Sequence, residues 1–451
     1  MNEQEASPFS GACKKIKSIL SKLLVICLIP FFSACSDEVP VYDPIEQPPL
    51  ESFNFSDINS DSSGNIYITG HTNISLGSAV NLGGNDFFLA QFDSEGTLAW
   101  SGSWGTDSED TSSNIQIDDE GNLLHIGNSY GMLDGVTAKV SRDITIHSFD
   151  TLGQLNWYKQ FYTDTDDHIL NSKLINSEIQ IVGAVSGDFR DFTSVGLLDA
   201  FLVSYSTSGV LNWSQTLGSI YNDSAHAIAL SPNGKTVIAG NASESIKSKT
   251  FLGSQDYFVA KFDSLGQFAQ HINYGSEYFE GVTDMEINQK GEIFLTGHTT
   301  GDLFDTYVSG TDLWIQKLNA SGSQNWAKQI ASTTVALFLD CIIKDDADLI
   351  CVGYVEDDFE GLTEIGGADI LIARFDTDGN QIWMKRIGTP ANDVGRKLHI
   401  DGSNNIWIGG STGGVYSTQE VLVNQSCSFI AKISDLGKVK IWSALGTGCT
   451  T

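Results

Sequence analysis

Five acidic side chains recur in this sequence at a near-constant spacing and could together bind a cation. They are Asp110, Asp167, Asp223, Glu280 and Asp393, with Phe53 in the first unit and Ala336 in the sixth. Each precedes an expected strand that would line a central channel, so their carboxylates could form a ring at the channel mouth. A ring of hard oxygen ligands suits Ca²⁺. The alternative is that each carboxylate caps backbone N–H groups where a strand begins. Beyond this candidate calcium site, we expect no cofactor.

Two short stretches match catalytic or metal-binding motifs. Residues 127–131 (GNSYG) fit the G-x-S-x-G pattern, and residues 376–380 (DTDGN) fit the opening of a calcium loop. A nucleophile elbow requires a helix after its turn, whereas the same slot elsewhere reads GHTNI and GHTTG, with no helical pattern behind it. The second match lacks the closing glutamate, and the eight histidines include no H-E-x-x-H pair. We therefore expect no catalytic residues.

A further column of residues is the candidate binding face. One residue per unit directly follows a recurring glycine. These residues are His71, Asn128, Asn241, His298, Tyr354 and Ser411, with Ala184 in the third unit. Their types vary while the frame around them is constant, as a binding surface requires and as unconstrained loops also show. We expect them on the face that carries the long loops, since loops on a rigid scaffold carry function.

An internal repeat sets all of these positions. A turn glycine recurs every 56 to 58 residues, at Gly96, Gly153, Gly209, Gly266, Gly322, Gly379 and Gly437. A tryptophan follows it by four residues at Trp100, Trp157, Trp213, Trp326 and Trp383. An aspartate opens a third segment at Asp86, Asp143, Asp199, Asp256, Asp312 and Asp369. Seven copies fit the chain.

Each unit is predicted to contain four strands, which in the first copy cover residues 55–60, 65–70, 86–92 and 97–103. Apolar residues occupy both faces of the middle strands, as in sheets packed between neighbours. The turns DSSGN and FDSEG are tight. Seven such units predict an all-β, seven-bladed β-propeller over residues 51–451. Ring closure stays open, because residues 50–55 could instead complete the last blade beside residues 442–445.

The pattern GNIYITGHT, followed by DFFLAQFDSEGTLAWS, resembles the bacterial β-propeller repeat known as SBBP. The resemblance covers all seven units and is weakest in the third and the seventh. It implies a propeller fold and an exported location. It transfers no catalytic residues, because the family has none established.

The N-terminus reads as an export signal. Lysines 14, 15, 17 and 22 precede the apolar run LLVICLIPFF, which is too short to span a bilayer and ends in Ser33-Ala34-Cys35. Residues 32–35 resemble the lipobox of bacterial lipoproteins, with Phe32 where leucine is usual. We expect residues 1–34 to be removed, Cys35 to be lipidated, and residues 35–50 to form a proline-rich acidic linker. The protein would then be anchored in the cell envelope, at the outer membrane or cell surface.

Four cysteines remain after the expected processing. Cys341 and Cys351 lie symmetrically about one turn, and Cys427 and Cys449 lie nearly symmetrically about another. Opposed positions in an antiparallel pair approach within reach of a disulfide, so two bonds are predicted. The alternative is four buried reduced thiols.

A net charge of -31 argues against nucleic acid as a partner and against direct adsorption to anionic lipid surfaces. We predict a non-catalytic binding or scaffold propeller with a protein or glycan partner. One alternative is a propeller enzyme that acts on a polysaccharide or another envelope substrate through its long-loop face. Another is a purely structural surface protein.

Overall fold

A computed structural model describes the chain from residue 51 to residue 446. The gaps in this description are residues 77–78, 134–140, 162–164, 189–192, 247–250 and 423–424. The predicted signal, Cys35, the linker and Cys449 lie outside the described residues.

The described residues form strands and no helix. The first two blades contain β1 (Glu51–Ser60), β2 (Ile66–Thr72), β3 (Asp86–Phe92), β4 (Leu98–Trp104), β5 (Asp110–Ile117), β6 (Leu123–Ser129), β7 (Asp143–Phe149) and β8 (Leu155–Phe161). The next two contain β9 (Asp167–Ile175), β10 (Glu178–Val185), β11 (Asp199–Ser206), β12 (Leu211–Leu217), β13 (Asp223–Leu230), β14 (Thr236–Ala242), β15 (Asp256–Phe262) and β16 (Phe268–Tyr274).

The last three blades complete the ring. They contain β17 (Glu280–Ile287), β18 (Ile293–Thr299), β19 (Asp312–Leu318), β20 (Gln324–Ile330), β21 (Ala336–Lys344), β22 (Asp348–Val355), β23 (Asp369–Asp376), β24 (Gln381–Ile387), β25 (Asp393–Ile400), β26 (Ile406–Thr412), β29 (Gln425–Ile433) and β30 (Val439–Leu445). A small hairpin, β27 (Gly414–Val415) with β28 (Glu420–Val421), lies in the loop between β26 and β29.

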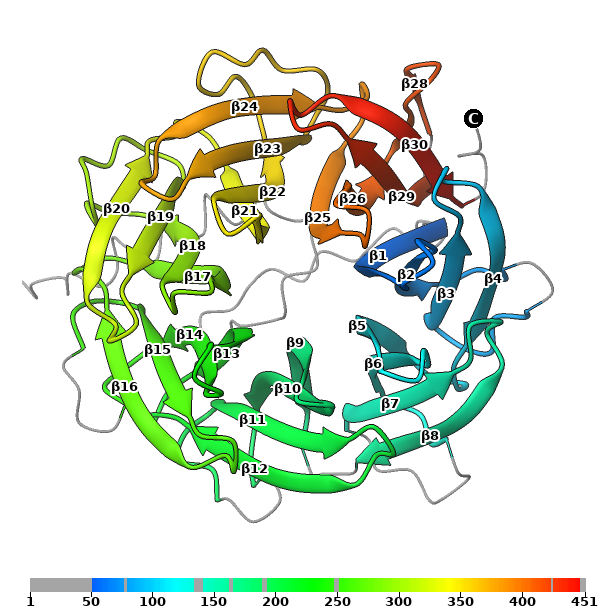
Figure 1. Cartoon of the computed structure of the whole chain (residues 1–451), viewed down its shortest axis with the longest axis horizontal. Helices are drawn as coiled ribbons and strands as arrows, with labels where there is room; N and C mark the ends of the chain where they lie inside the picture. The colour runs from blue at the N-terminus through cyan, green and yellow to red at the C-terminus, as the bar shows by residue number, and fades with distance from the viewer. Residues whose placement is uncertain are drawn as a thin grey trace, which may run out of the picture. The chain divides into compact units, whose positions relative to one another are not determined.

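Each blade is a meander of four antiparallel strands, and the seven blades surround one axis (Figure 1). The innermost strands are β1, β5, β9, β13, β17, β21 and β25. The predicted seven-bladed propeller is thereby confirmed. Turns after the first and third strand of a blade lie on one face, which we call the tight-turn face. The longer connections lie on the opposite, long-loop face.

The ring closes through the same contact that joins its other blades. Residues 51 and 52 of β1 pair in parallel with residues 425 and 426 of β29. Equivalent parallel bridges join Leu198 to Asn222, Gln255 to Phe279 and Thr311 to Val335. Since β30 pairs with β29 and completes the last blade, residues 51–55 begin the first blade and do not complete the last.

The hydrophobic core lies between blades. Seven apolar clusters occupy the seven seams between neighbouring blades. At the closing seam, for example, Phe53 and Phe55 of the first blade pack with Trp407 and Ile430 of the last. Each blade therefore depends on both of its neighbours to cover its faces.

The tryptophan and turn-glycine columns form one interaction across the seams. The indole Nε1 of Trp326 donates to the carbonyl oxygen of Thr377 in the next blade at 3.0 Å, and Trp383 donates to Asp435 at 2.9 Å. The turn glycine of the next blade lies against the same ring. A Cβ on Gly379, whose φ is +81°, would lie 2.9 Å from a ring carbon of Trp326. Glycine is thus required there by backbone conformation and by close packing.

The structure contains a disulfide between Cys341 and Cys351, which face each other on β21 and β22, with an S–S distance of 2.07 Å. This is the first of the two predicted bonds. Cys427 is fully buried in β29. Its predicted partner, Cys449, lies outside the described residues, so the second bond stays a prediction.

Replacing Gly379 by alanine is expected to destabilise the protein more than the same change at Gly121. Both glycines have positive φ, but nothing lies within 4 Å of a Cβ added to Gly121. We expect Gly121→Ala to cost roughly 1–2 kcal/mol for the left-handed conformation. Gly379→Ala should cost roughly 1–3 kcal/mol more for overpacking against Trp326. Urea denaturation measures both, and equal losses would contradict the tryptophan contact.

Candidate functional site

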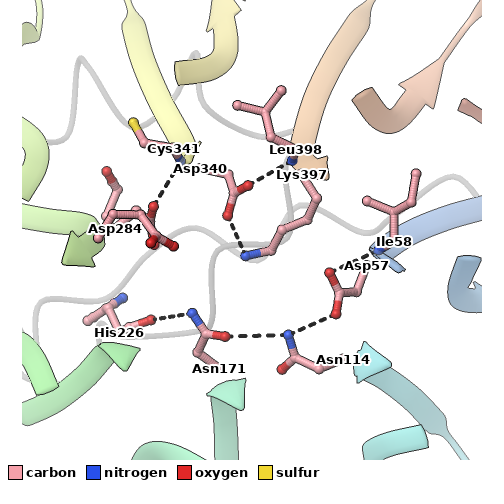
Figure 2. A network of polar contacts seen from close by, with 12 residues as sticks. Asp57, Ile58, Asn114, Asn171, His226, Asp284, Asp340, Cys341, Lys397 and Leu398 are labelled. Carbon is pink, nitrogen blue, oxygen red and sulfur yellow. Dashed lines mark hydrogen bonds and ion pairs between the residues drawn. The ribbon is translucent and has the colours of Figure 1, made fainter. Parts of the chain in front are cut away.

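Polar residues form a ring around the central channel at one equivalent position per blade. The ring consists of Asp57, Asn114, Asn171, Asp284, Asp340 and Lys397, with Ala227 in the fourth blade. Each follows a β-bulge in the innermost strand, where one extra residue interrupts pairing with the second strand. A bulge re-aims the side chains beside it. Figure 2 shows these polar side chains reaching from one innermost strand toward the next.

The acidic members of this channel ring bind the backbone of the following blade. Asp57 accepts a hydrogen bond from the N–H of Ile115 at 2.9 Å. Asp284 accepts one from Cys341 at 2.8 Å, and Asp340 accepts one from Leu398 at 2.7 Å (Figure 2). The carboxylates therefore hold neighbouring blades together.

The two asparagines extend the same network around the axis. Asn114 donates to Asp57 at 3.3 Å and to the side-chain oxygen of Asn171 at 3.5 Å. Asn171 in turn donates to the backbone carbonyl of His226 at 3.2 Å. Polar contacts thus run from the first blade to the fourth without leaving the channel.

Burial and charge set the protonation of the ring. Burial raises the pKa of Asp57 to about 6. Burial, with a further contribution from Asp340, raises the pKa of Asp284 to about 7. Lys397 lies 2.9 Å from Asp340, and although burial lowers its pKa, the surrounding carboxylates raise it overall. Burial therefore favours the protonated form of the Asp57 and Asp284 carboxyl groups.

The predicted acidic column lies at the start of the innermost strands. Asp110, Asp223, Glu280 and Asp393 each accept a hydrogen bond from the backbone N–H four residues earlier, at 2.5 to 2.8 Å. Asp167 occupies the same position and is likewise buried. This is the capping arrangement given above as the alternative to a calcium site. Within the described residues, no group of three or more histidine, cysteine or acidic side chains could hold a metal ion, so the structure gives the calcium site no support.

The predicted binding column lies in the seams. Its members, His71, Asn128, Asn241, His298, Tyr354 and Ser411, are each the next-to-last residue of a second strand. Asn241 accepts a hydrogen bond from Val282 of the next blade at 2.9 Å, and Asn128 accepts one from Ile169 at 3.3 Å. Burial lowers the pKa of His71 and of His298 to about 4. Ser411 accepts a hydrogen bond from the N–H of Phe55 at 3.5 Å, so three members of the column contact the neighbouring blade, and Tyr354 is buried.

The two motif matches also have local roles. The hydroxyl of Ser129 is buried and exchanges hydrogen bonds with the backbone of Gly131 in its own turn. Asp376 accepts hydrogen bonds from the N–H groups of Asp378 and Asn380, which closes the tight turn after β23.

An apolar rim on the long-loop face was not anticipated from the sequence. One exposed side chain precedes the third strand in each of five blades. The rim consists of Leu82, Val195, Leu252, Val308 and Ile365, which are 42 to 61% exposed. Ile220, Tyr221 and Tyr278 are exposed on connections of the same face.

Buried aspartates hold the backbone at four of the five rim positions. The N–H of Leu82 donates to the carboxylate of Asp86, four residues later, at 2.8 Å. Val195 and Leu252 donate in the same way to the aspartates that open β11 and β15, at 2.7 and 2.8 Å. Ile365 donates to Asp369 at 3.0 Å. The sequence pattern that could have revealed the rim is an apolar residue four positions before the third-strand aspartate.

No helix of the described chain is long and apolar enough to cross a membrane. No family model matches the sequence. No curated protein matches it either.

Solved structures match this chain at low sequence identity. A protein of unknown function from Bacteroides caccae is 9% identical over 68% of this chain and 92% of its own, with a TM-score of 0.41. Raptor from Chaetomium thermophilum is 10% identical over 79% of this chain and 26% of its own, with a TM-score of 0.49. A gluconolactonase from Xanthomonas campestris is 10% identical over 67% of this chain and 84% of its own, with a TM-score of 0.36. Similarity at this level carries no conclusion about function.

Replacing Asp57 by asparagine is expected to change how stability depends on pH. The pKa of Asp57 is raised from 3.8 to about 6, so the folded state holds this proton more tightly than the unfolded state. The resulting stabilisation is complete below about pH 4 and is lost as the pH rises through 6. The free energy of unfolding of the wild type should therefore fall by up to about 3 kcal/mol between pH 4 and pH 7 because of this group. Asp57→Asn should lack this part of the pH dependence.

Urea denaturation at pH 4 and at pH 7 gives the free energy of unfolding of the wild type and of Asp57→Asn, and the two pH differences are compared. Glu95→Gln, in an exposed turn, is the control and should reproduce the wild-type difference. The assignment fails if Asp57→Asn changes stability equally at both pH values.

Proposed function

We propose that this protein is an exported, lipid-anchored propeller of the SBBP-repeat type that binds another protein through its long-loop face and performs no catalysis. The observation that carries the proposal is the apolar rim. Its side chains are exposed at equivalent positions of five blades, and at four of these positions the backbone N–H is hydrogen-bonded to a buried aspartate. Exposed apolar side chains gathered on one face favour a protein partner.

The placement of the buried polar groups supports a binding role over catalysis. The acidic side chains of the channel and the seams accept backbone hydrogen bonds that hold turns and neighbouring blades. A catalytic carboxylate has to be free to reach a substrate in at least one step of its reaction. In this protein, the same groups stabilise the frame that presents the rim.

The export and anchoring parts of the proposal rest on the N-terminal sequence. A lysine-rich start, a short apolar run and the Phe32-Ser33-Ala34-Cys35 stretch favour processing as a lipoprotein. Several acyl chains on Cys35 would hold the protein stably at a membrane, because each buried CH₂ contributes about 0.8 kcal/mol. The proline-rich residues that follow would act as a semi-rigid spacer between the anchor and the propeller.

Mutation of the rim tests the binding role. The variant Val195→Ser, Leu252→Ser, Val308→Ser is expected to lose a partner that is cross-linked to the wild type in its native envelope. The control variant Leu152→Ser, Leu265→Ser, Leu436→Ser changes three side chains that are 67 to 71% exposed in tight turns of the opposite face. It should retain the partner. Both variants should unfold within roughly 1 kcal/mol of the wild type, because the changed residues are exposed.

If both variants retain the same cross-linked partner, or if both lose it, the long-loop face is not the binding surface. Thermal unfolding of each purified variant separates loss of binding from loss of the fold.

The anchor is tested separately by intact mass and protease shaving of whole cells, with Cys35→Ala as the control. The expected mass is that of a chain beginning at Cys35 with a diacyl or triacyl addition, which the variant lacks. Cleavage of the wild type on intact cells would place it at the surface. A mass without lipid, beginning at another residue, would contradict the lipoprotein assignment.

A further inference from the structure

Three lysines line a recess on the tight-turn face between the fourth and fifth blades. The recess has a volume of about 160 Å³ and is lined by Lys235, Lys261 and Lys290, together with polar side chains that include Asn233 and Gln270. The chain as a whole carries 56 acidic and only 25 basic side chains, so a local excess of positive charge is unusual for it. The neighbouring blades explain how this excess arises.

Basic residues recur near the end of the third strand in the last four blades. They are Lys261, Lys317, Arg374 and Lys432. Each donates to a backbone carbonyl of the next blade around the ring, in the tight turn after the third strand of that blade. In the fifth blade, Lys317 is also paired with Glu292 at 3.0 Å. In the sixth blade, Arg374 is paired with Asp348.

The fourth blade has a lysine where its neighbours have the paired acid. Glu178, Lys235, Glu292 and Asp348 occupy the same position, five residues before the second-strand glycine, in blades three to six. The acid that would neutralise Lys261 is thereby replaced by a second cation. A change from acid to base at this position reverses the local charge, while the four-stranded structure of the blade is the same as in its neighbours.

Lys261 is the most buried lysine of the three. Its side chain is 7% exposed, and its Nζ donates to the carbonyl oxygen of Ala320 at 2.7 Å. An ammonium group has three N–H donors, and a buried cation without a counter-ion is costly. No described residue forms an ion pair with Lys261, Lys235 or Lys290. Burial, and then Lys235, lowers the pKa of Lys261.

We propose that this recess is an oxyanion site that binds a carboxylate, sulfate or phosphate group. The anion would occupy the position that Glu292 holds beside Lys317 in the next blade. Lys261 would contact it from the base of the recess, and Lys235 and Lys290 from its mouth. The ligand is a small anion or the charged group of a larger molecule such as an acidic sugar. The site lies on the face opposite the apolar rim and is independent of the function proposed for that face.

The decisive variant is Lys235→Glu, which restores the acid found in the neighbouring blades. Equilibrium dialysis with radiolabelled sulfate should show saturable binding to the wild type and at least a tenfold weaker affinity for Lys235→Glu. The melting temperature of Lys235→Glu without sulfate should be equal to or higher than that of the wild type, because Lys261 gains an internal partner. Lys385→Glu makes the same charge change at an exposed site on β24 and should bind sulfate like the wild type.

Equal sulfate binding by the wild type and Lys235→Glu, or no saturable binding by the wild type, would overturn the proposal. Lys290→Gln, at an exposed turn residue, provides a second test that leaves the buried lysine in place and should also weaken sulfate binding. Competition by sodium phosphate, sodium glucuronate and sodium acetate at constant ionic strength then identifies the ligand class. Stronger competition by glucuronate than by acetate indicates a sugar acid, and stronger competition by phosphate indicates a phosphate-bearing ligand.

Discussion

The seam between blades is the constraint on which the rest of this structure depends. A blade satisfies the backbone hydrogen bonds of its inner strands within its own four-stranded sheet, but both faces of that sheet are apolar and must be covered by other blades. Seven clusters of apolar side chains provide that cover. Apolar packing is not directional. The angle and register of each blade are therefore fixed by polar contacts that cross the seam, such as the bond from Asp340 to the N–H of Leu398.

This constraint accounts for the columns that make the repeat visible. A tryptophan that donates across a seam requires a glycine in the turn that it covers, and both therefore recur with the period of the blade. The aspartates that begin the first and third strands recur because each accepts a hydrogen bond from the loop before it. A residue type that recurs in nearly every copy is thus explained by contacts that hold the blades and their loops together. Function is better sought where copies differ, or where a fixed frame presents an exposed side chain.

The sequence was sufficient to predict the fold, because seven copies of one period specify the number of blades and two kinds of tight turn specify the strand order. It was less informative about the site, for two physical reasons. The second strands extend two residues beyond the glycine that was taken as their end, so the column after that glycine lies inside a seam. In the innermost strands a bulge breaks the two-residue alternation of faces, and this hid the channel ring around Asp57 and Lys397. A bulge is set by pairing with a neighbour and has no signature in composition alone.

The charge pattern of the fourth blade differs from that of its neighbours. In blades five and six, a base on the third strand forms an ion pair with an acid where the second strand begins, Glu292 or Asp348, so the pair is complete within the blade. In the fourth blade the same architecture holds two bases, and packing gives neither of them an internal counter-ion among the described residues. The neighbouring blades serve as a reference for this difference, because they show that an acid at this position pairs with the base of the third strand and stabilises the fold. The reversed charge at Lys235 therefore points to a partner outside the chain, and the complementary charge of that partner is negative.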